Sequence, residues 1–277
     1  MWGSIIGDLA GSVYEYDQSK NGVHPVTVNK VIENNAFFTD NTIMTVAVAD
    51  AIFNEDELYI KYYKKYVEEY EKYMPEFKPY FDTIFSPDFV KIINGEASPD
   101  SKSSSALTRI SPVGFLFKKP SLVDTQAIWA TGITHNTPEA LNNARLVALL
   151  THYFKQGLTE QEVKDTLKQT EKHPGLDLDL GTIAYKPFEK FNLTCSETMD
   201  NVLYAVFSSD CYEEAVRKVI SFGGDTGANA SITGGIAEAA FGVPEELVEK
   251  AKIKLPERFV NVINNAYVKM NKKDDDE

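Results

Sequence analysis

Two short polar segments of the sequence stand directly ahead of apolar or small-residue segments. They are Phe38-Thr39-Asp40-Asn41-Thr42 and Phe222-Gly223-Gly224-Asp225-Thr226-Gly227. Asp, Asn and Thr at such places cap helices, because their oxygens accept hydrogen bonds from the free N–H groups of the first turn. If the two segments face each other, the same oxygens suit a hard cation such as Mg²⁺, and the N–H groups suit a phosphate. The spacing alone leaves both interpretations open, two capped helices or one ligand site.

Motifs for other common chemistries are missing from the sequence. It contains no G-x-G-x-x-G, no P-loop, no H-E-x-x-H and no C-x-x-C. The four histidines lack metal-ligand spacing, and we expect His152 and His173 to be surface residues or satisfied core residues. Two cysteines, Cys195 and Cys211, are too few for a disulfide framework, which predicts an intracellular protein.

The composition is that of a folded protein with an acidic surface. The 277 residues are 43% hydrophobic and 25% charged, which excludes wholesale disorder. A net charge of −13 argues against a surface for nucleic acid or anionic membrane. The first residues, with Asp8 and no basic region, make a poor signal peptide, and no apolar run reaches the ~20 residues of a membrane span. We therefore expect a cytoplasmic protein.

The segments that position the polar residues are mostly helical in pattern. We expect an all-α domain of about ten helices, including residues 42–53, 55–73, 137–154, 159–172, 197–208, 212–221, 228–241, 244–253 and 257–270. Residues 23–31 are the best strand candidate. The irregular stretch 74–105 reads either as a lid or binding loop or as a solvated connection with one short helix. We assign residues 1–270 to one domain and 271–277 to a charged tail.

Small residues recur every four positions in two segments. Gly3, Gly7 and Gly11 do so near the start, and Ala230 and Gly234 near the end. Residues at i and i+4 share a helix face, where small side chains let two backbones approach closely. The pattern predicts two tightly packed central helices.

Five segments, in the same order, resemble the ADP-ribosylglycohydrolase family of the dinitrogenase-reductase-activating type. They are GSIIGDLAGSVYE (3–15), FTDNTIMTVAVADAI (38–52), TRISPVGFLF (108–117), THNTPEA (134–140) and GGDTGANASITGGIAEAAFG (223–242) followed by VPEEL. The resemblance implies a single-domain, orthogonal all-α bundle whose cleft binds two Mg²⁺ or Mn²⁺ ions. It also implies hydrolysis of the bond between the ADP-ribose C1″ and an acceptor.

The resemblance assigns roles position by position. It implies Glu15 and Asp40 as catalytic residues and Thr39, Asp40, Asn41 and Asp225 as ion ligands. Arg109 matches a position near the site. The positions expected to contact ADP-ribose are Ser103, Ser104, Ser105, His135, Gly223 and Gly224.

The departures from the family pattern fall in the site itself. Asn41 replaces an Asp, Gly227 and Ala228 replace an Asp and a Thr, and three serines replace a G-N-G. Asn41 can still ligate through its carbonyl oxygen. The chain keeps three site carboxylates, so two divalent ions would leave net positive charge in a low-dielectric cleft. We expect at most one well-held ion.

Two functions compete on this basis. The first is an ADP-ribosyl hydrolase that works with a depleted, one-ion site. The second is a catalytically inactive relative that binds ADP-ribose or a nucleotide as an interaction module.

Overall fold

The computed structural model describes residues 1–56, 58–70, 83–169, 185, 188–191 and 193–275. These residues form α-helices, one short 3-10 helix and two isolated β-bridges, and they contain no β-strand. The helices in chain order are α1 (Trp2–Asn21), α2 (Asp40–Phe53), α3 (Tyr59–Tyr70), α4 (Pro87–Asn94), η2 (Ser104–Ala106), α5 (Ser111–Leu116), α6 (Pro120–Gly132), α7 (Pro138–Lys155), α8 (Glu160–Leu167), α9 (Cys195–Phe207), α10 (Tyr212–Ser221), α11 (Thr226–Phe241), α12 (Glu245–Ile253) and α13 (Glu257–Asp275).

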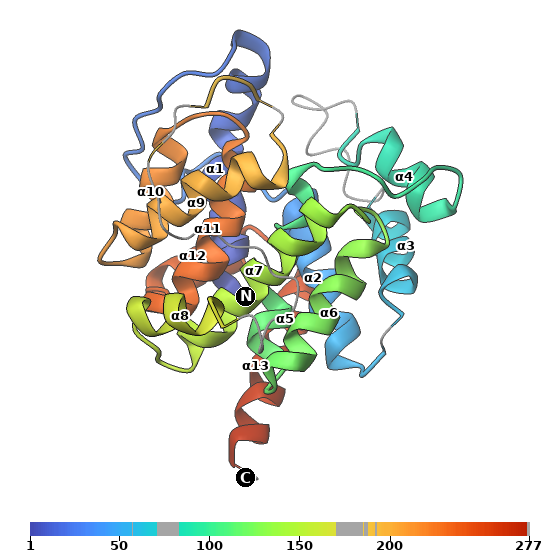
Figure 1. Ribbon diagram of the computed structural model, residues 1–277. Coiled ribbons are helices and arrows are strands. Elements are labelled where there is room, and N and C mark those ends of the chain that lie inside the picture. The colour runs from blue at the N-terminus through green and yellow to red at the C-terminus, as the bar shows by residue number, and fades with distance from the viewer. Residues whose placement is uncertain (57, 71–82, 170–184, 186–187, 192, 276–277) are drawn as a thin grey trace.

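Helices α1 and α11 form the centre of the bundle and run antiparallel in backbone contact (Figure 1). A Cβ built on Gly3 would lie 2.3 Å from the carbonyl oxygen of Gly234, and one built on Gly7 would lie 2.0 Å from that of Ala230. A Cβ on Gly11 would lie 2.1 Å from the carbonyl oxygen of Thr226. No larger residue fits at these contacts, which confirms the predicted packing of two small-residue helices.

The other helices surround this pair in two groups (Figure 1). Helices α8 to α10 and α12 gather on the side of α11, and α2 to α6 gather on the opposite side. Helix α7 lies between the groups and contacts α5, α6, α9 and α11. This arrangement is the all-α bundle expected from the sequence, and it brings the start of α2 close to the start of α11.

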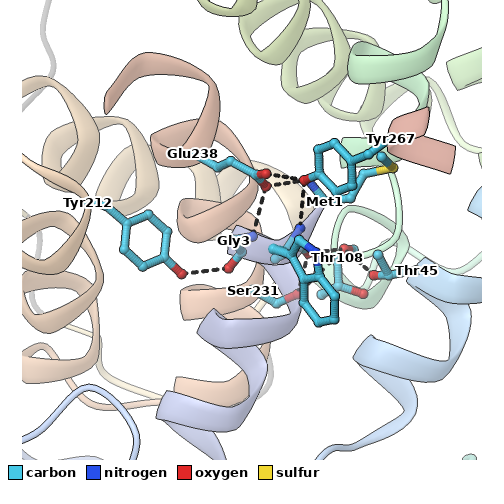
Figure 2. A network of polar contacts seen from close by, with 10 residues as sticks. Met1, Gly3, Thr45, Thr108, Tyr212, Ser231, Glu238 and Tyr267 are labelled. Atoms are coloured by element: carbon cyan, nitrogen blue, oxygen red, sulfur yellow. Dashed lines mark hydrogen bonds and ion pairs between the residues drawn. The ribbon is translucent and has the colours of Figure 1, made fainter. Parts of the chain in front are cut away.

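A carboxylate at the far end of α11 holds the beginning of α1 (Figure 2). Glu238 accepts hydrogen bonds from the Gly3 N–H at 2.8 Å, from the Met1 nitrogen and from the Tyr267 hydroxyl. The Tyr212 hydroxyl donates to the Gly3 carbonyl at 2.7 Å. These bonds fix the register between α1 and α11. That register sets where the residues at the opposite ends of the two helices lie.

The expected helices are confirmed with small shifts at their ends, except that residues 71–73 and 170–172 lie outside the described residues. Two helices, α5 and α6, were missed, and each has a proline in its first turn. Helix α4 agrees with the short helix expected for a solvated connection within 74–105. The strand expected at residues 23–31 is wrong, because this segment forms no ladder. Its Val26 and Val28 instead pack against the core from an extended connection. Helix α13 continues past residue 270 to Asp275.

The irregular stretch 74–105 is described from residue 83 onward, so its earlier part lies outside the described residues, as does His173. The described part contains α4 and a segment, 99–105, that is bonded to its neighbours on both sides. The Ser104 N–H donates to the Leu193 carbonyl at 3.2 Å, and the Cys195 N–H donates to the Lys102 carbonyl at 2.8 Å. Among the described helices, none has the length and apolar character to cross a membrane.

Candidate functional site

A cavity of about 210 Å³ lies where the N-terminal ends of three α-helices meet. Its wall includes Asp40, the first residue of α2, Ser86, the N-cap of α4, and Asp225, the N-cap of α11. Glu15 of α1 and Arg109, which lies just before α5, belong to the same wall. Side chains that are more than 200 positions apart in the sequence therefore face one small volume.

Both polar segments cap their helices. The Thr39 hydroxyl accepts a hydrogen bond from the Asn41 N–H at 3.2 Å at the start of α2. The Asp225 carboxylate accepts one from the Ala228 N–H at 3.1 Å at the start of α11. The capping interpretation is therefore right, and it does not exclude a ligand site, because Asn41 and Asp225 also line the cavity.

A fully buried carboxylate that sequence reasoning missed, Asp8 of α1, organises the start of α2. It accepts hydrogen bonds from the hydroxyls of Thr39 and Thr42, both at 2.6 Å, and from their backbone N–H groups. The Asn41 Nδ2 donates to it at 3.2 Å. A single charged residue among the small and apolar residues of 2–12 was the available signal, because such a residue is buried only with partners.

These bonds leave Thr39 and Asn41 with different capacities as ion ligands. The Thr39 hydroxyl gives its proton to Asp8, accepts from Asn41, and is not part of the cavity wall. The Asn41 amide is oriented by Asp8, which needs a donor, so its Oδ1 remains the end available to a ligand. Of the two, Asn41 is better placed to bind a cation in the cavity.

The cavity carboxylates crowd one another, and this raises their affinity for protons. Burial, together with the charges of Asp8 and Asp225, raises the pKa of Asp40 to about 7. Burial raises the pKa of Asp225 to about 6. Burial and the charges of Asp225, Asp40 and Asp8 raise the pKa of Glu15 well above its ordinary value. Like charges in a desolvated site therefore favour the binding of a proton or a cation.

The carboxylate of Glu15 lies over the backbone of Gly227. A Cβ built on Gly227 would be 2.4 Å from Oε2 of Glu15, too close for a real side chain. The same Oε2 is buried and has no hydrogen-bond partner in the described part of the chain. An unpartnered anionic oxygen is costly to bury, so this atom marks a place for a cation, a proton or a donor from a ligand.

The three serines in the 99–105 segment are placed differently. Ser103 and Ser105 line the cavity, whereas Ser104 is 2% exposed and is not part of the cavity wall. His135 is also outside the cavity wall, and its Nε2 lies 3.4 Å from the Ser105 hydroxyl. Burial and the nearby charge of Arg109 lower the pKa of His135 to about 3, so the ring is neutral. His135 therefore reaches the cavity only through Ser105.

Gly223 and Gly224 do not line the cavity. Both have positive φ, and a Cβ on Gly223 would lie 2.3 Å from the carbonyl oxygen of His24. The Gly224 N–H donates to Oε1 of Gln18 at 3.1 Å. These glycines make room for the protein's own chain, and the turn that they form directs Asp225 toward the cavity.

The donor types of the cavity fit a divalent cation. Asp40, Asp225 and the amide oxygen of Asn41 are all oxygen donors, the kind that Mg²⁺ and Mn²⁺ take. Among the described residues, no three His, Cys, Asp or Glu side chains form a ready-made ion cage. The fit therefore rests on the donor types.

Comparison with known proteins gives a consistent family assignment. The model of the ADP-ribosylglycohydrolase family matches residues 1–274. The chain is 23% identical over 163 residues to ADP-ribosylarginine hydrolase Tri1 of Pseudomonas putida (strain GB-1), which is 56% of this chain and 44% of that protein. The chain thus spans less than half the length of this curated relative.

A solved structure described as an ADP-ribosylglycohydrolase-related protein complex has the same fold. It superposes with a TM-score of 0.67 at 16% identity, covering 97% of this chain and 95% of the other. The family model extends over the five matching segments and over all the helices that carry the cavity residues. The chain therefore belongs to the ADP-ribosylglycohydrolase family.

Proposed function

We propose that this protein hydrolyses an ADP-ribosyl glycosidic bond with a site that holds one Mg²⁺ or Mn²⁺ ion. The observation that carries the proposal is the meeting of Glu15, Asp40 and Asp225 in one cavity of a chain that belongs to this family. The relative in Pseudomonas putida is named for ADP-ribosylarginine, so an arginine-linked ADP-ribose is the first substrate to test.

Asp40, Asp225 and the amide oxygen of Asn41 are the residues that would hold the ion. A bound divalent cation polarises a ligand oxygen and lowers the pKa of a bound water. The proposal places one ion there because Gly227 and Ala228 offer no side-chain oxygen and because Glu15 already lies against Gly227.

Glu15 has the properties of a general acid. Burial and the neighbouring carboxylates raise its pKa, which favours the protonated carboxyl group, and its Oε2 has no competing partner in the described part of the chain. In hydrolysis a water oxygen bonds to C1″, the bond from C1″ to the acceptor breaks, and the acceptor needs a proton. A protonated carboxyl group beside that bond is suited to supply it.

The test is release of free ADP-ribose from ADP-ribosylated arginine, ADP-ribosylated serine and O-acetyl-ADP-ribose, with and without Mn²⁺. We expect metal-dependent release from at least one substrate, and loss of about 100-fold or more in rate for Glu15→Gln. Asp56→Asn, a surface carboxylate paired with Lys61, is the matched control and keeps its activity. No release from any of the three, with intact binding of ADP-ribose, would reject hydrolysis.

That last outcome is the signature of the alternative function, an inactive ADP-ribose-binding module. It is favoured by one observation, namely that the Glu15 carboxylate fills the space beside Gly227. Calorimetry with ADP-ribose separates the two functions, since the module binds the product without turning over any substrate.

A further inference from the structure

Arg109 is the most deeply buried large side chain of the cavity wall, with 1% of its surface exposed. Its guanidinium carbon lies 4.9 Å from the centre of the Tyr63 ring and 6.0 Å from that of Phe89. Its Nη2 donates to the Thr134 hydroxyl. A side-chain hydrogen bond also joins Arg109 to Tyr63. Two rings and these two hydrogen bonds therefore hold the position and the plane of the guanidinium group.

The backbone next to Arg109 is also held firmly (Figure 2). The carbonyl of Thr108 accepts hydrogen bonds from Ser4 of α1 at 3.0 Å and from Thr45 of α2 at 3.1 Å. Ser231 of α11 lies 2.9 Å from the Ser4 hydroxyl and closes the network. Helices α1, α2 and α11 thus hold the backbone from which the Arg109 side chain projects.

A hydrogen-bond chain continues from the guanidinium group to the opposite end of the wall. The Thr134 hydroxyl, which accepts from Arg109, lies 2.7 Å from Nδ1 of His135. Nε2 of the neutral His135 ring lies 3.4 Å from the Ser105 hydroxyl. The chain thus links the guanidinium group to a residue of the cavity wall.

One donor of Arg109 is nevertheless left over. Its Nε is buried and has no hydrogen-bond partner in the described part of the chain. An arginine cannot lose its proton to escape this cost, and a fixed guanidinium plane cannot turn the N–H toward another acceptor. Because Arg109 is part of the cavity wall, a ligand oxygen bound in that cavity could supply the missing acceptor.

We propose that Arg109 is a ligand-binding residue whose Nε–H donates to an oxygen of a bound ribose phosphate. The proposal rests on the proposed function for its ligand class, but not on any metal ion. The cavity holds about 210 Å³, below the ~300 Å³ of small ligand pockets, so it takes only one end of ADP-ribose. That oxygen is either a hydroxyl of the terminal ribose or a phosphate oxygen, and both are acceptors.

The experiment compares the affinities of ADP-ribose and AMP for the wild type and for Arg109→Lys by calorimetry. Lysine keeps the charge but cannot place a planar N–H at this point. A lost charged hydrogen bond predicts binding of ADP-ribose weaker by about 10- to 100-fold. Weakening for ADP-ribose alone places the acceptor on the terminal ribose or on the phosphate attached to it, and equal weakening for AMP places it on the phosphate attached to adenosine.

Arg145→Lys is the matched control, a second buried arginine that instead pairs with Asp124 at 2.6 Å and lies outside the cavity. It should lose stability without losing affinity for ADP-ribose. Unchanged affinity in Arg109→Lys overturns the inference while the proposed function stands. Absence of ADP-ribose binding by the wild type rejects both.

A measurement on the wild type covers the case in which Arg109→Lys does not fold. The Nε–H resonance of Arg109, observed by ¹⁵N NMR, should shift and exchange more slowly with solvent when ADP-ribose is added. A resonance that ADP-ribose leaves unchanged, in protein shown to bind it, would contradict the inference.

Discussion

Asp8 shows how one residue can support a site without lining it. It is not part of the cavity wall, but it bonds to Thr39, Asn41 and Thr42 and so sets where α2 begins. We predict that Asp8→Asn lowers the free energy of unfolding by about 2–4 kcal/mol, because an amide cannot accept all of these donors. Urea unfolding measures this change, and a loss below about 1 kcal/mol would show that the donors find other partners.

The crowded carboxylates make stability depend on pH. Since Asp40 has a pKa of about 7 in the folded protein and about 4 when unfolded, the folded state holds a proton that the unfolded chain releases. The free energy of unfolding should therefore fall as pH rises from about 4 to about 7. Melting temperatures at several pH values measure this slope, and Asp40→Asn should flatten it.

A divalent cation should act in the opposite direction, because it binds the ionised carboxylates and stabilises only the folded state. Mn²⁺ should raise the melting temperature more at pH 8 than at pH 5. The same shift at both pH values would mean that the ion binds away from Asp40 and Asp225.

Restoring the missing family ligands tests the alignment of the closing motif. The triple change Asn41→Asp, Gly227→Asp and Ala228→Thr adds two carboxylates and a hydroxyl. An aspartate at 227 must push the Glu15 carboxylate aside, so the variant should be less stable than the wild type without metal. Mn²⁺ should then raise its melting temperature by more than it raises that of the wild type. Equal shifts of the melting temperature by Mn²⁺ in the variant and the wild type would mean that residues 227 and 228 are not the positions of the family's ligands.

At the scale of elements, the contact between α1 and α11 controls the geometry of the site. The Gly7 Cα is so close to Ala230 that a methyl group would lie 2.0 Å from the carbonyl oxygen. We predict that Gly7→Ala costs about 3 kcal/mol or more. Gly132→Ala, where the nearest atom is 3.6 Å away, should be neutral or slightly stabilising. Thermal unfolding of the two variants compares them directly.

A binding loop at 99–105 would be more mobile than the helices, yet its backbone is bonded to two neighbouring segments. The amides of Ser104 and Cys195 donate to Leu193 and Lys102, and the amide of Asn136 donates to Pro99. We therefore expect the amides of Ser104 and Cys195 to exchange slowly with solvent, at rates close to those of helix amides. Exchange as fast as in an exposed loop would show that the segment is mobile.

How much of the fold the sequence predicts depends on the length of the pattern. Long helices with caps, such as α7 after Thr137, were predicted within a few residues. Helices α5 and α6 were not predicted, although Pro112 and Pro120 stand in their first turns, a position to which proline is well suited. The alternation at 23–31 reflects packing against the core and not a sheet.

The candidate site was predictable only where a motif matched. Asp40 and Asp225 could be named from their segments. No local pattern tells that Ser104 lies outside the cavity wall or that the Thr39 hydroxyl donates to Asp8. The position of Glu15 over Gly227 depends on how α1 and α11 cross, which is a tertiary property.

For the whole molecule, the net charge of −13 acts on any anionic ligand before it reaches the cavity. We expect the association rate constant of ADP-ribose to rise as salt increases from about 10 mM to about 100 mM, because the Debye length falls from about 30 Å to about 10 Å. Stopped-flow binding measures this trend. A falling rate would mean that Arg109 and the helix N-termini dominate the local potential.

The pairing of α1 with α11 also has a consequence for synthesis on the ribosome. Gly11 contacts Thr226, which follows it by 215 positions. At about 5–20 residues per second, α1 leaves the ribosome roughly 10–40 s before its partner exists. During that interval its apolar surface has no native neighbour on the α11 side, so chaperone contact and aggregation compete with folding. The cavity, which needs Glu15 and Asp225 together, cannot assemble until this late stage.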